Sequence, residues 1–347
     1  PNPVCEHTVA KSPWKDGKGD VLKELSEACA KDGLKFGVYI SPWDRNDPTY
    51  GTPAYNDVYA KTLESALGSY GEVFEQWFDG ANGEGPNGKR QDYDWPLFNG
   101  MVRRIQPNAV IFSDIGPDCR WVGNEHGSAG RTCWGRLDTE GFTPGAGAPC
   151  QDTLNRGNAL GAYWIPAETD VSIRPGWFWR ESENDKVKSV NELLRIYYES
   201  VGRNSLLLLN VPPDTTGRIN AADSVRLMEF RAALDNIFKD NLAEGAKAEA
   251  TSARGGNFKA QNILNEEYDS FWAAPDDVTE ASITIDLKGE KTFNLIQIQE
   301  YIPLGQRVKS FTVEALNADG SWTEIASETT IGYKRIIPVE EVTTSKI

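Results

Sequence analysis

The chain has 347 residues, of which 39% are hydrophobic and 25% are charged, and its formal net charge is −15. This length suits two domains, and the composition is typical of a globular protein with enough apolar side chains for a core. The acidic balance excludes a nucleic-acid-binding protein, because a phosphate backbone is neutralised by a basic surface. No apolar run approaches the ~20 residues of a membrane helix, so membrane insertion is excluded as well.

Histidine and cysteine, the usual ligands of transition metals, are few. The sequence has only His7 and His126, which excludes a multi-histidine metal centre within it. The cysteines are odd in number and lack a Cys-x-x-Cys pair, a pattern that indicates neither a zinc framework nor a disulfide scaffold. One disulfide within residues 119–150 and free buried thiols are both left open. The five positions are Cys5, Cys29, Cys119, Cys133 and Cys150.

Strand-like and amphipathic helix-like segments alternate in the first part of the chain. The predicted strands cover residues 36–41, 73–78, 109–113, 163–171 and 206–211, and the predicted helices cover 19–32, 52–69, 94–105, 186–202 and 221–239. This alternation predicts βαβ units and a parallel sheet, and we assign residues 1–240 to a (β/α)8-like barrel domain. A closed barrel needs eight strands. The sequence therefore predicts an N-terminally incomplete barrel whose first three strands lie upstream of Pro1.

Polar side chains gather directly after the predicted strands. They are Ser41, Trp43 and Asp44, then Asp79, Asp114, Glu168 and Asn210. In a (β/α) barrel the active site is built at this end of the strands. Residues 116–160 are rich in Gly and Pro and show no helical pattern, so we expect a long functional loop there.

From Asn241 the pattern changes to short alternating strands separated by Gly, Asn and Asp. The predicted strands cover residues 281–287, 295–300, 310–315, 322–326 and 334–338. We assign residues 241–347 to an all-β domain of the sandwich type. Residues 344–347 resemble the beginning of another strand, which predicts that this domain is C-terminally incomplete.

Asp79 is the first candidate for chemistry, because it follows a predicted strand, lies beside Trp77 and precedes Gly80. A glycine there allows a sharp turn and close approach of a ligand to the backbone. The alternative is that Asp79 only caps the following turn. If Asp79 serves glycoside hydrolysis, a second carboxyl group is required. Residue chemistry leaves four candidates for it open, namely Asp114, Asp118, Glu125 and Glu168.

Seven segments, in order along the chain, resemble the α-L-fucosidases of glycoside hydrolase family 29. They are Ser12–Asp20, Phe36–Asn46, Trp77–Gly80, Phe112–Asp118, Arg120–Glu125, Ile173–Phe178 and Asn204–Pro213. In that family the aspartate of the Trp-Phe-Asp-Gly element is the nucleophile, which implies Asp79. The elements Trp-Val-Gly-Asn-Glu and Trp-Asp-Arg-Asn resemble the subgroup selective for α-1,3/1,4-linked fucose in branched, Lewis-type glycans. In that subgroup the glutamate is the acid/base, which implies Glu125.

The resemblance further implies a retaining mechanism, for which the two carboxyl groups lie roughly 5–5.5 Å apart. Implied substrate-binding residues are Tyr39, Trp43, Asp44, Trp77, Arg120 and Trp177. Barrel packing is the alternative role for Trp77, and Trp179 is a rival of Trp177. Asp114 is interpreted as a supporting residue, and Arg174 and Asn210 as structural ones. No cofactor is expected to be needed for catalysis.

The sequence departs from the family in one respect. Family members carry fucose-binding histidines in His-Phe-Gly and Lys-His-His-Asp-Gly-Phe elements on their first strands, and neither element occurs here. Two rival functions stand beside the α-1,3/1,4-selective enzyme, and the missing histidines favour the second of them. One is a broader α-L-fucosidase that also cleaves α-1,2 linkages, and the other is a non-catalytic glycan-binding barrel.

The C-terminal domain resembles a discoidin-like carbohydrate-binding module of the family 32 type. The matching segments are Asn241–Ala243, Ala250–Ala253, Tyr268–Ala274, Ile283–Leu287 and Gln299–Val308. Such modules often hold a structural calcium ion, for which Asp269 is the candidate ligand. The alternative is that the domain only supports the barrel. The resemblance also implies a periplasmic or secreted protein acting on a fucosylated oligosaccharide or glycoconjugate, although no signal peptide opens the sequence. The oligomeric state is not predicted.

Overall fold

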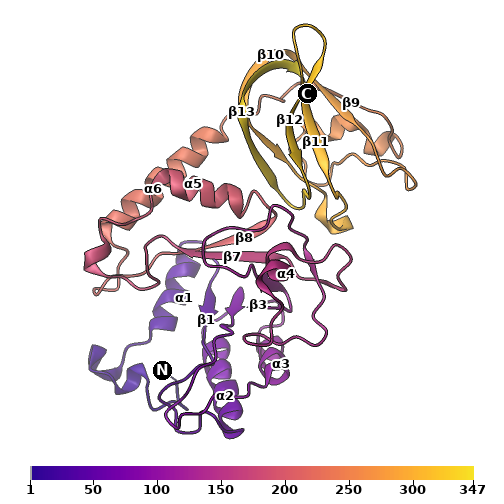
Figure 1. Ribbon diagram of the computed structural model, residues 1–347. Helices are drawn as coiled ribbons and strands as arrows, with labels where there is room; N and C mark the ends of the chain where they lie inside the picture. The colour runs from indigo at the N-terminus through magenta and orange to yellow at the C-terminus, as the bar shows by residue number, and fades with distance from the viewer. Residues whose placement is uncertain (1) are drawn as a thin grey trace. The chain divides into compact units, whose positions relative to one another are not determined.

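The computed structural model describes residues 2–347 (Figure 1). Two compact units are present: the first contains the described residues up to Gly123 together with residues 136–167, and the second contains residues 124–135 and 168–347. The loop 124–135 thus belongs with the C-terminal part of the chain. None of the described helices is both long and apolar enough to cross a lipid bilayer.

The first unit is built on four parallel strands in the order β1-β2-β3-β4. Their bounds are Gly37–Tyr39, Glu75–Trp77, Val110–Ser113 and Cys119–Trp121. Tyr39 of β1 is in register with Trp77 of β2, which is in register with Phe112 of β3. This arrangement confirms the predicted parallel sheet and aligns three aromatic side chains across it.

Helices of the first unit follow the predicted order. Their bounds are α1 Val21–Lys31, α2 Ala54–Gly68, α3 Trp95–Ile105 and α4 Gln151–Arg156, with 3-10 turns at Val9–Lys11 and Trp14–Gly17. Asp20 and Asp94 cap α1 and α3 by accepting hydrogen bonds from backbone N–H groups of the first turn. The buried faces of α2 and α3 meet the strands in one core, which includes Leu63, Phe98 and Ile111.

The prediction that residues 116–160 lack regular structure is wrong. They contain β4, the helix α4 and the two-residue strand β5 (Arg136–Leu137), which pairs with β6 (Tyr163–Trp164). These elements are short and lie in a Gly- and Pro-rich segment, so no hydrophobic period marks them in the sequence. The sequence consequently missed β4, and the predicted strand 163–171 is interrupted at Pro166, which has no backbone N–H to donate.

In the second unit β7 (Ala167–Ser172, of which Ala167 itself ends the first unit) and β8 (Ser205–Asn210) are neighbouring strands. A 3-10 turn spans Glu181–Glu183, and helices α5 (Val190–Glu199) and α6 (Ala221–Ile237) lie side by side (Figure 1). Together with β1 to β4 of the first unit, β7 and β8 give six described strands in this sheet, whereas the sequence predicted five. The fold is α/β of the (β/α)-barrel type, as predicted.

The C-terminal residues form antiparallel sheets. Strands β9 (Lys247–Ala250), β10 (Ile283–Ile298) and β13 (Arg335–Lys346) pair in the order β13-β10-β9, and β11 (Phe311–Leu316) pairs with β12 (Trp322–Glu328). Three 3-10 turns cover Gly256–Phe258, Ala260–Leu264 and Ile302–Leu304. Figure 1 shows β10 and β13 running side by side as long curved strands.

Two strand predictions in this domain are corrected. The segments predicted as separate strands over 281–287 and 295–300 are parts of one strand, β10, which bends where Lys288 and Gly289 have positive φ angles of 58° and 136°. Residues 344–346 end β13 rather than beginning another strand. The predicted domain boundary at residues 240 and 241 lies between α6 and β9 and stays a prediction. All five cysteines are free thiols, so no disulfide links residues 119–150.

Candidate active site

Asp79 lies just beyond the end of β2, and both of its carboxylate oxygens accept a hydrogen bond. Oδ2 accepts from the phenol of Tyr39 at 2.5 Å, and Oδ1 accepts from the backbone N–H of Ala81 at 2.8 Å. The side chain is half-buried. A carboxylate held at both oxygens has a fixed orientation, which is what attack on a single carbon atom requires.

The side chains in register across β1, β2 and β3 form an aromatic row beside Asp79. The ring centroids of Tyr39 and Trp77 are 5.3 Å apart with planes inclined by 27°, and those of Trp77 and Phe112 are 4.0 Å apart and inclined by 11°. Tyr39 is 57% exposed and Phe112 is buried. Burial and the hydrogen bond to Asp79 raise the pKa of the Tyr39 phenol well above its usual range, so this hydroxyl stays a donor.

Asp114 follows β3 and supports the backbone around Asp79. Its Oδ2 accepts the backbone N–H of Gly145 at 2.6 Å. A Cβ atom added to Gly80 would lie 2.5 Å from that same carboxylate oxygen, and one added to Gly145 would lie 2.3 Å from the carbonyl oxygen of Gly80. Burial raises the pKa of Asp114, the hydrogen bond from Gly145 lowers it, and the charge of Asp79 raises it again, with a raised pKa as the net result. Both glycines are thus required by close packing.

Trp43 and Asp44 lie in the loop after β1. Trp43 is 37% exposed, its indole N–H donates to the carbonyl of Glu84 at 3.2 Å, and its ring covers Gly83. Asp44 accepts backbone N–H groups of Asn46 and Asp47 at 2.7 and 3.1 Å, which closes a tight turn. These hydrogen bonds fix the conformation of the loop, and the exposed part of the Trp43 indole ring is accessible to a ligand.

Arg120 and Asp118 are held by interior contacts of the first unit. Arg120 is fully buried, and its guanidinium donates to the carbonyls of Leu154, at 2.8 Å, and of Ile165. Asp118 pairs with Arg103 at 2.5 Å and accepts the backbone N–H of Ile111. These contacts fasten α4 and β4 in place. The predicted contact of Arg120 with sugar stays a prediction.

Glu125 lies in the loop 124–135 of the second unit and is exposed. Its Oε2 accepts the indole N–H of Trp177 at 3.2 Å. The carbonyl of Trp177 accepts from the side-chain amide of Asn210 at 3.0 Å, and that amide also donates to Ser172 at 3.0 Å. Asn210, interpreted as structural, thus supports the partner of Glu125. Ser172 is not among the predicted site residues, and its only signal in the sequence is its position at the end of a predicted strand.

Arg174 and Glu168 are buried in the second unit, and Trp179 is half-buried there. Arg174 and Asp223 form a fully buried ion pair, with Nε 2.9 Å from Oδ2. Glu168 on β7 is 3% exposed. The indole N–H of Trp179 is buried and has no acceptor among the described residues, whereas that of Trp177 reaches Glu125. The choice of Trp177 rather than Trp179 as the substrate-binding residue stays a prediction.

Asp269 in the C-terminal domain is exposed and accepts a hydrogen bond from the phenol of Tyr301 at 3.0 Å. Within the described residues it belongs to no group of three His, Cys, Asp or Glu side chains spaced to share an ion. Calcium also binds carbonyl oxygens. The predicted calcium site therefore stays a prediction.

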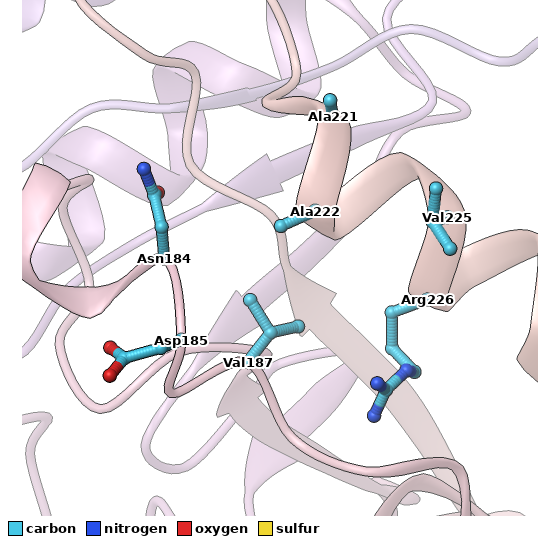
Figure 2. A pocket seen from close by; sticks show the side chains of 7 residues that line it. All are labelled: Asn184, Asp185, Val187, Ala221, Ala222, Val225 and Arg226. Atoms are coloured by element: carbon cyan, nitrogen blue, oxygen red, sulfur yellow. The ribbon is translucent and has the colours of Figure 1, made fainter.

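The second unit also contains a hollow of about 460 Å³ between the start of α6 and residues 184–187 (Figure 2). Figure 2 shows that the side chains around it are mostly small or apolar. They are Asn184, Asp185, Val187, Ala221, Ala222, Val225 and Arg226. None of the predicted site residues lines this hollow.

Comparison with known proteins assigns both parts of the chain. The family model described as Alpha-L-fucosidase matches residues 6–235, and the F5/8 type C domain model matches residues 247–345. The chain is 45% identical to "Putative alpha-L-fucosidase 1" of Oryza sativa subsp. japonica and 40% identical to "Alpha-L-fucosidase 1" of Arabidopsis thaliana, over 98% and 100% of its length. It spans about two thirds of these relatives, 66% and 68%.

Solved structures agree with this assignment. A putative alpha-L-fucosidase from Bacteroides thetaiotaomicron superposes with a TM-score of 0.92 at 37% identity, covering 100% of this chain and 76% of the other. A Ruminococcus gnavus GH29 fucosidase solved in complex with fucose has a TM-score of 0.89 at 32% identity, covering 100% and 75%. The chain therefore belongs to the alpha-L-fucosidase family, glycoside hydrolase family 29, and carries a C-terminal F5/8 type C (discoidin-like) domain.

Proposed function

We propose that the protein is a retaining α-L-fucosidase in which Asp79 is the nucleophile and Glu125 is the acid/base. The observation that carries this proposal is the orientation of Asp79, whose two oxygens are held by Tyr39 and Ala81 beside the Tyr39–Trp77 aromatic pair. Sugar rings present apolar C–H faces, for which an exposed aromatic surface is a suitable partner. The fucose complex of the Ruminococcus gnavus relative supports the same sugar here.

The reaction proceeds by two displacements. In the first, a carboxylate oxygen of Asp79 bonds to the anomeric carbon of fucose, the bond from that carbon to the aglycone oxygen breaks, and Glu125 gives its proton to the departing oxygen. In the second, Glu125 takes a proton from water, the water oxygen bonds to the anomeric carbon, and the ester bond to Asp79 breaks. Two inversions release α-L-fucose with its configuration retained.

The substrate class within this proposal is α-1,3/1,4-linked fucose in branched glycans. Its support is the resemblance of the elements around Trp43 and Glu125 to the subgroup with that selectivity. A periplasmic or secreted location and a calcium ion at Asp269 belong to the same proposal, and both are supported by the resemblance alone.

Release of free fucose from three substrates tests the proposal. They are an aryl α-L-fucoside, a Lewis-type trisaccharide and an α-1,2-fucosylated trisaccharide. Release from the branched trisaccharide but not from the α-1,2-linked one supports the selective enzyme, whereas release from both trisaccharides indicates the broader enzyme. Binding of all three without release would identify a non-catalytic glycan-binding protein and overturn the proposal.

The role of Glu125 has its own test. Glu125→Ala should abolish turnover of the natural glycan but keep some turnover of an aryl fucoside with a good leaving group. Azide should raise that residual rate, because it replaces the water that Glu125 would activate. Asp79→Ala should show no such acid-type rescue. Normal glycan turnover by Glu125→Ala would transfer the acid role to Asp114.

A further inference from the structure

The loop 124–135, which carries Glu125, contains no helix or strand. An irregular segment loses conformational entropy when it is fixed, so side-chain contacts must hold it in place. A general acid must also be held near one position, because proton transfer needs hydrogen-bond distance to the departing oxygen. The contacts of this loop therefore decide how well Glu125 can act.

The first half of the loop is attached to the end of α5. The backbone N–H of Ala129 donates to the carbonyl of Glu199 at 2.8 Å, and Arg203 donates to the carbonyl of Ala129 at 3.0 Å. Gly127, with a φ of +74°, packs so closely that an added Cβ would lie 2.9 Å from Ile196. This end of the loop is supported by the (β/α)-barrel part of the second unit.

The second half is attached to the C-terminal β domain, chiefly through Arg131. Its guanidinium makes a two-pronged ion pair with Glu328, with Nε 2.8 Å from Oε2 and Nη2 3.1 Å from Oε1, and donates to the carbonyl of Ser327 at 2.5 Å. Arg335 also pairs with Glu328 and donates to the carbonyl of Arg131 at 2.7 Å. The Arg335 side chain is 3% exposed and that of Glu328 is 14% exposed.

Backbone groups of the loop are bound by the same domain. The side-chain amide of Gln306 accepts the N–H of Gly135 at 2.8 Å and donates to the carbonyl of Cys133 at 2.9 Å. Thr330 accepts the N–H of Cys133 at 3.0 Å. A backbone donor and acceptor satisfied by one amide leave the segment little freedom to shift.

The turn that joins β12 to β13 is itself well fixed. The carboxylate of Glu300 accepts the N–H of Gly332 at 2.6 Å, and the side chain of Asn204 accepts the N–H of Tyr333 at 2.7 Å. Asn204 also donates to the carbonyl of Cys133 at 3.1 Å. The loop, the turn and the start of β8 thus form one hydrogen-bonded assembly.

We propose that the C-terminal β domain is a positioning element for catalysis, which holds Glu125 at its working position through the clamp formed by Arg131, Glu328, Arg335 and Gln306. This inference rests on the proposed function, since it assigns Glu125 the acid/base role. Arg131 and Gln306 are positioning residues, because they act through the loop. The role is separate from any binding of sugar by the β domain.

The test measures how the rate depends on the leaving group. Arg131→Ala and the double variant Arg131→Ala/Gln306→Leu are compared with the unaltered protein on aryl α-L-fucosides whose phenols differ in pKa. Phenols that leave readily need no proton from Glu125, whereas poor ones do. We expect kcat/KM for phenyl fucoside to fall about 10-fold in the single variant and more in the double variant. For the dinitrophenyl fucoside, kcat/KM of both variants should stay within about twofold of the value for the unaltered protein. The dependence of kcat/KM on the pKa of the leaving phenol would then be steeper in the variants.

A matched control variant is available, and failure of the positioning role gives a different result from failure of the proposed function. Arg254→Ala removes a different ion pair of the β domain, the one between Arg254 and Asp276, and neither of these residues contacts the loop 124–135. This variant should leave the dependence of the rate on phenol pKa unchanged. The Arg131 side chain is 63% exposed, so Arg131→Ala should fold, as thermal unfolding will verify. An equal loss on all aryl fucosides, or no loss, would overturn the positioning role while leaving the proposed function standing. An unaltered protein that releases no fucose from any substrate would overturn both.

Discussion

Asp79 and Glu125 are supported in opposite ways. Asp79 lies just beyond the end of β2. Its hydrogen-bond partner Tyr39 lies on the neighbouring strand β1, and its other partner, Ala81, is two residues further along the chain. Glu125 sits in a loop without regular structure, whose Arg131 pairs with Glu328, 197 residues further along the chain. One carboxylate thus depends on the sheet, and the other on contacts between distant segments.

This difference means that the position of Asp79 is rigid, whereas the position of Glu125 can be adjusted. A group at the end of a parallel strand is fixed by the sheet, which suits a nucleophile that must meet one carbon atom in line. A group on a loop can be repositioned by changing the loop's distant anchors without altering the sheet. If the comparison is right, damage near Asp79 should affect every substrate, whereas damage near Glu125 should affect only substrates with poor leaving groups.

The largest effect should come from Asp79→Asn, which keeps the shape of the side chain and one acceptor oxygen but removes the proposed nucleophile. We expect kcat to fall by about 10⁴-fold or more on natural and activated fucosides alike, because no covalent intermediate can form. Fucose release under single-turnover conditions measures this loss. Substantial turnover of the activated fucoside by this variant would show that Asp79 is not the nucleophile.

Gly80→Ala should be next in size. The new Cβ would lie 2.5 Å from the Asp114 carboxylate and 2.6 Å from the backbone nitrogen of Gly145, so the turn after Asp79 must shift. We expect a loss of about 1–3 kcal/mol in unfolding free energy, together with lower kcat on all substrates. Gly100→Ala in α3 is the matched control, since its Cβ would meet no atom within 4 Å apart from its chain neighbours and the helix's own backbone, and it should stabilise the protein by up to ~1 kcal/mol. Equal stability of the two variants would contradict the packing argument.

The parts of the molecule that are predictable from the sequence are those whose structure is determined by nearby residues. The strands before Asp79 and Asp114 lie in longer β-rich segments of the sequence, residues 73–78 and 109–113, and helices such as α2 and α3 carry a helical period; all of them appear in the structure. β4 and α4 lie in the Gly- and Pro-rich segment 116–160, where no such pattern marks them, and β10 is predicted as two strands because its irregularity at Lys288 resembles a turn. The contacts of Arg131 could not be predicted, because its partner Glu328 lies 197 residues away and no pattern near Arg131 in the sequence indicates this pairing.

Removing one hydrogen-bond donor from each carboxylate sharpens the comparison. Tyr39→Phe deletes the hydroxyl that contacts Asp79, and Trp177→Phe deletes the indole N–H that contacts Glu125. A hydrogen bond to a charged group contributes about 1.5–3 kcal/mol, so we expect losses of roughly 10- to 100-fold in kcat. Tyr39→Phe should slow every substrate, and Trp177→Phe should spare the activated fucoside. Identical substrate profiles for the two variants would end the proposed division of roles.

The smallest expected effect is a pH dependence of the clamp. Burial alone would raise the pKa of Glu328, but hydrogen bonds and charges from Arg131 and Arg335 hold it below its ordinary value of 4.5. The folded protein therefore keeps this carboxylate charged at a lower pH than the unfolded chain does. Its contribution to stability is complete above pH 4.5 and is lost as the pH falls through the lowered folded value.

Denaturant unfolding of the unaltered protein and Glu328→Gln, at pH 7 and at pH values descending below 4.5, measures this contribution. At pH 7 we expect the variant to be about 1–3 kcal/mol less stable, because buried Arg335 loses its charged partner. The gap should narrow in acid, where the native carboxylate also becomes neutral. A gap that stays constant with pH would mean that the shape of residue 328, rather than its charge, holds the loop. The loop that carries Glu125 would then depend on packing, as the strand end at Asp79 does, and the contrast between the two carboxylates would weaken.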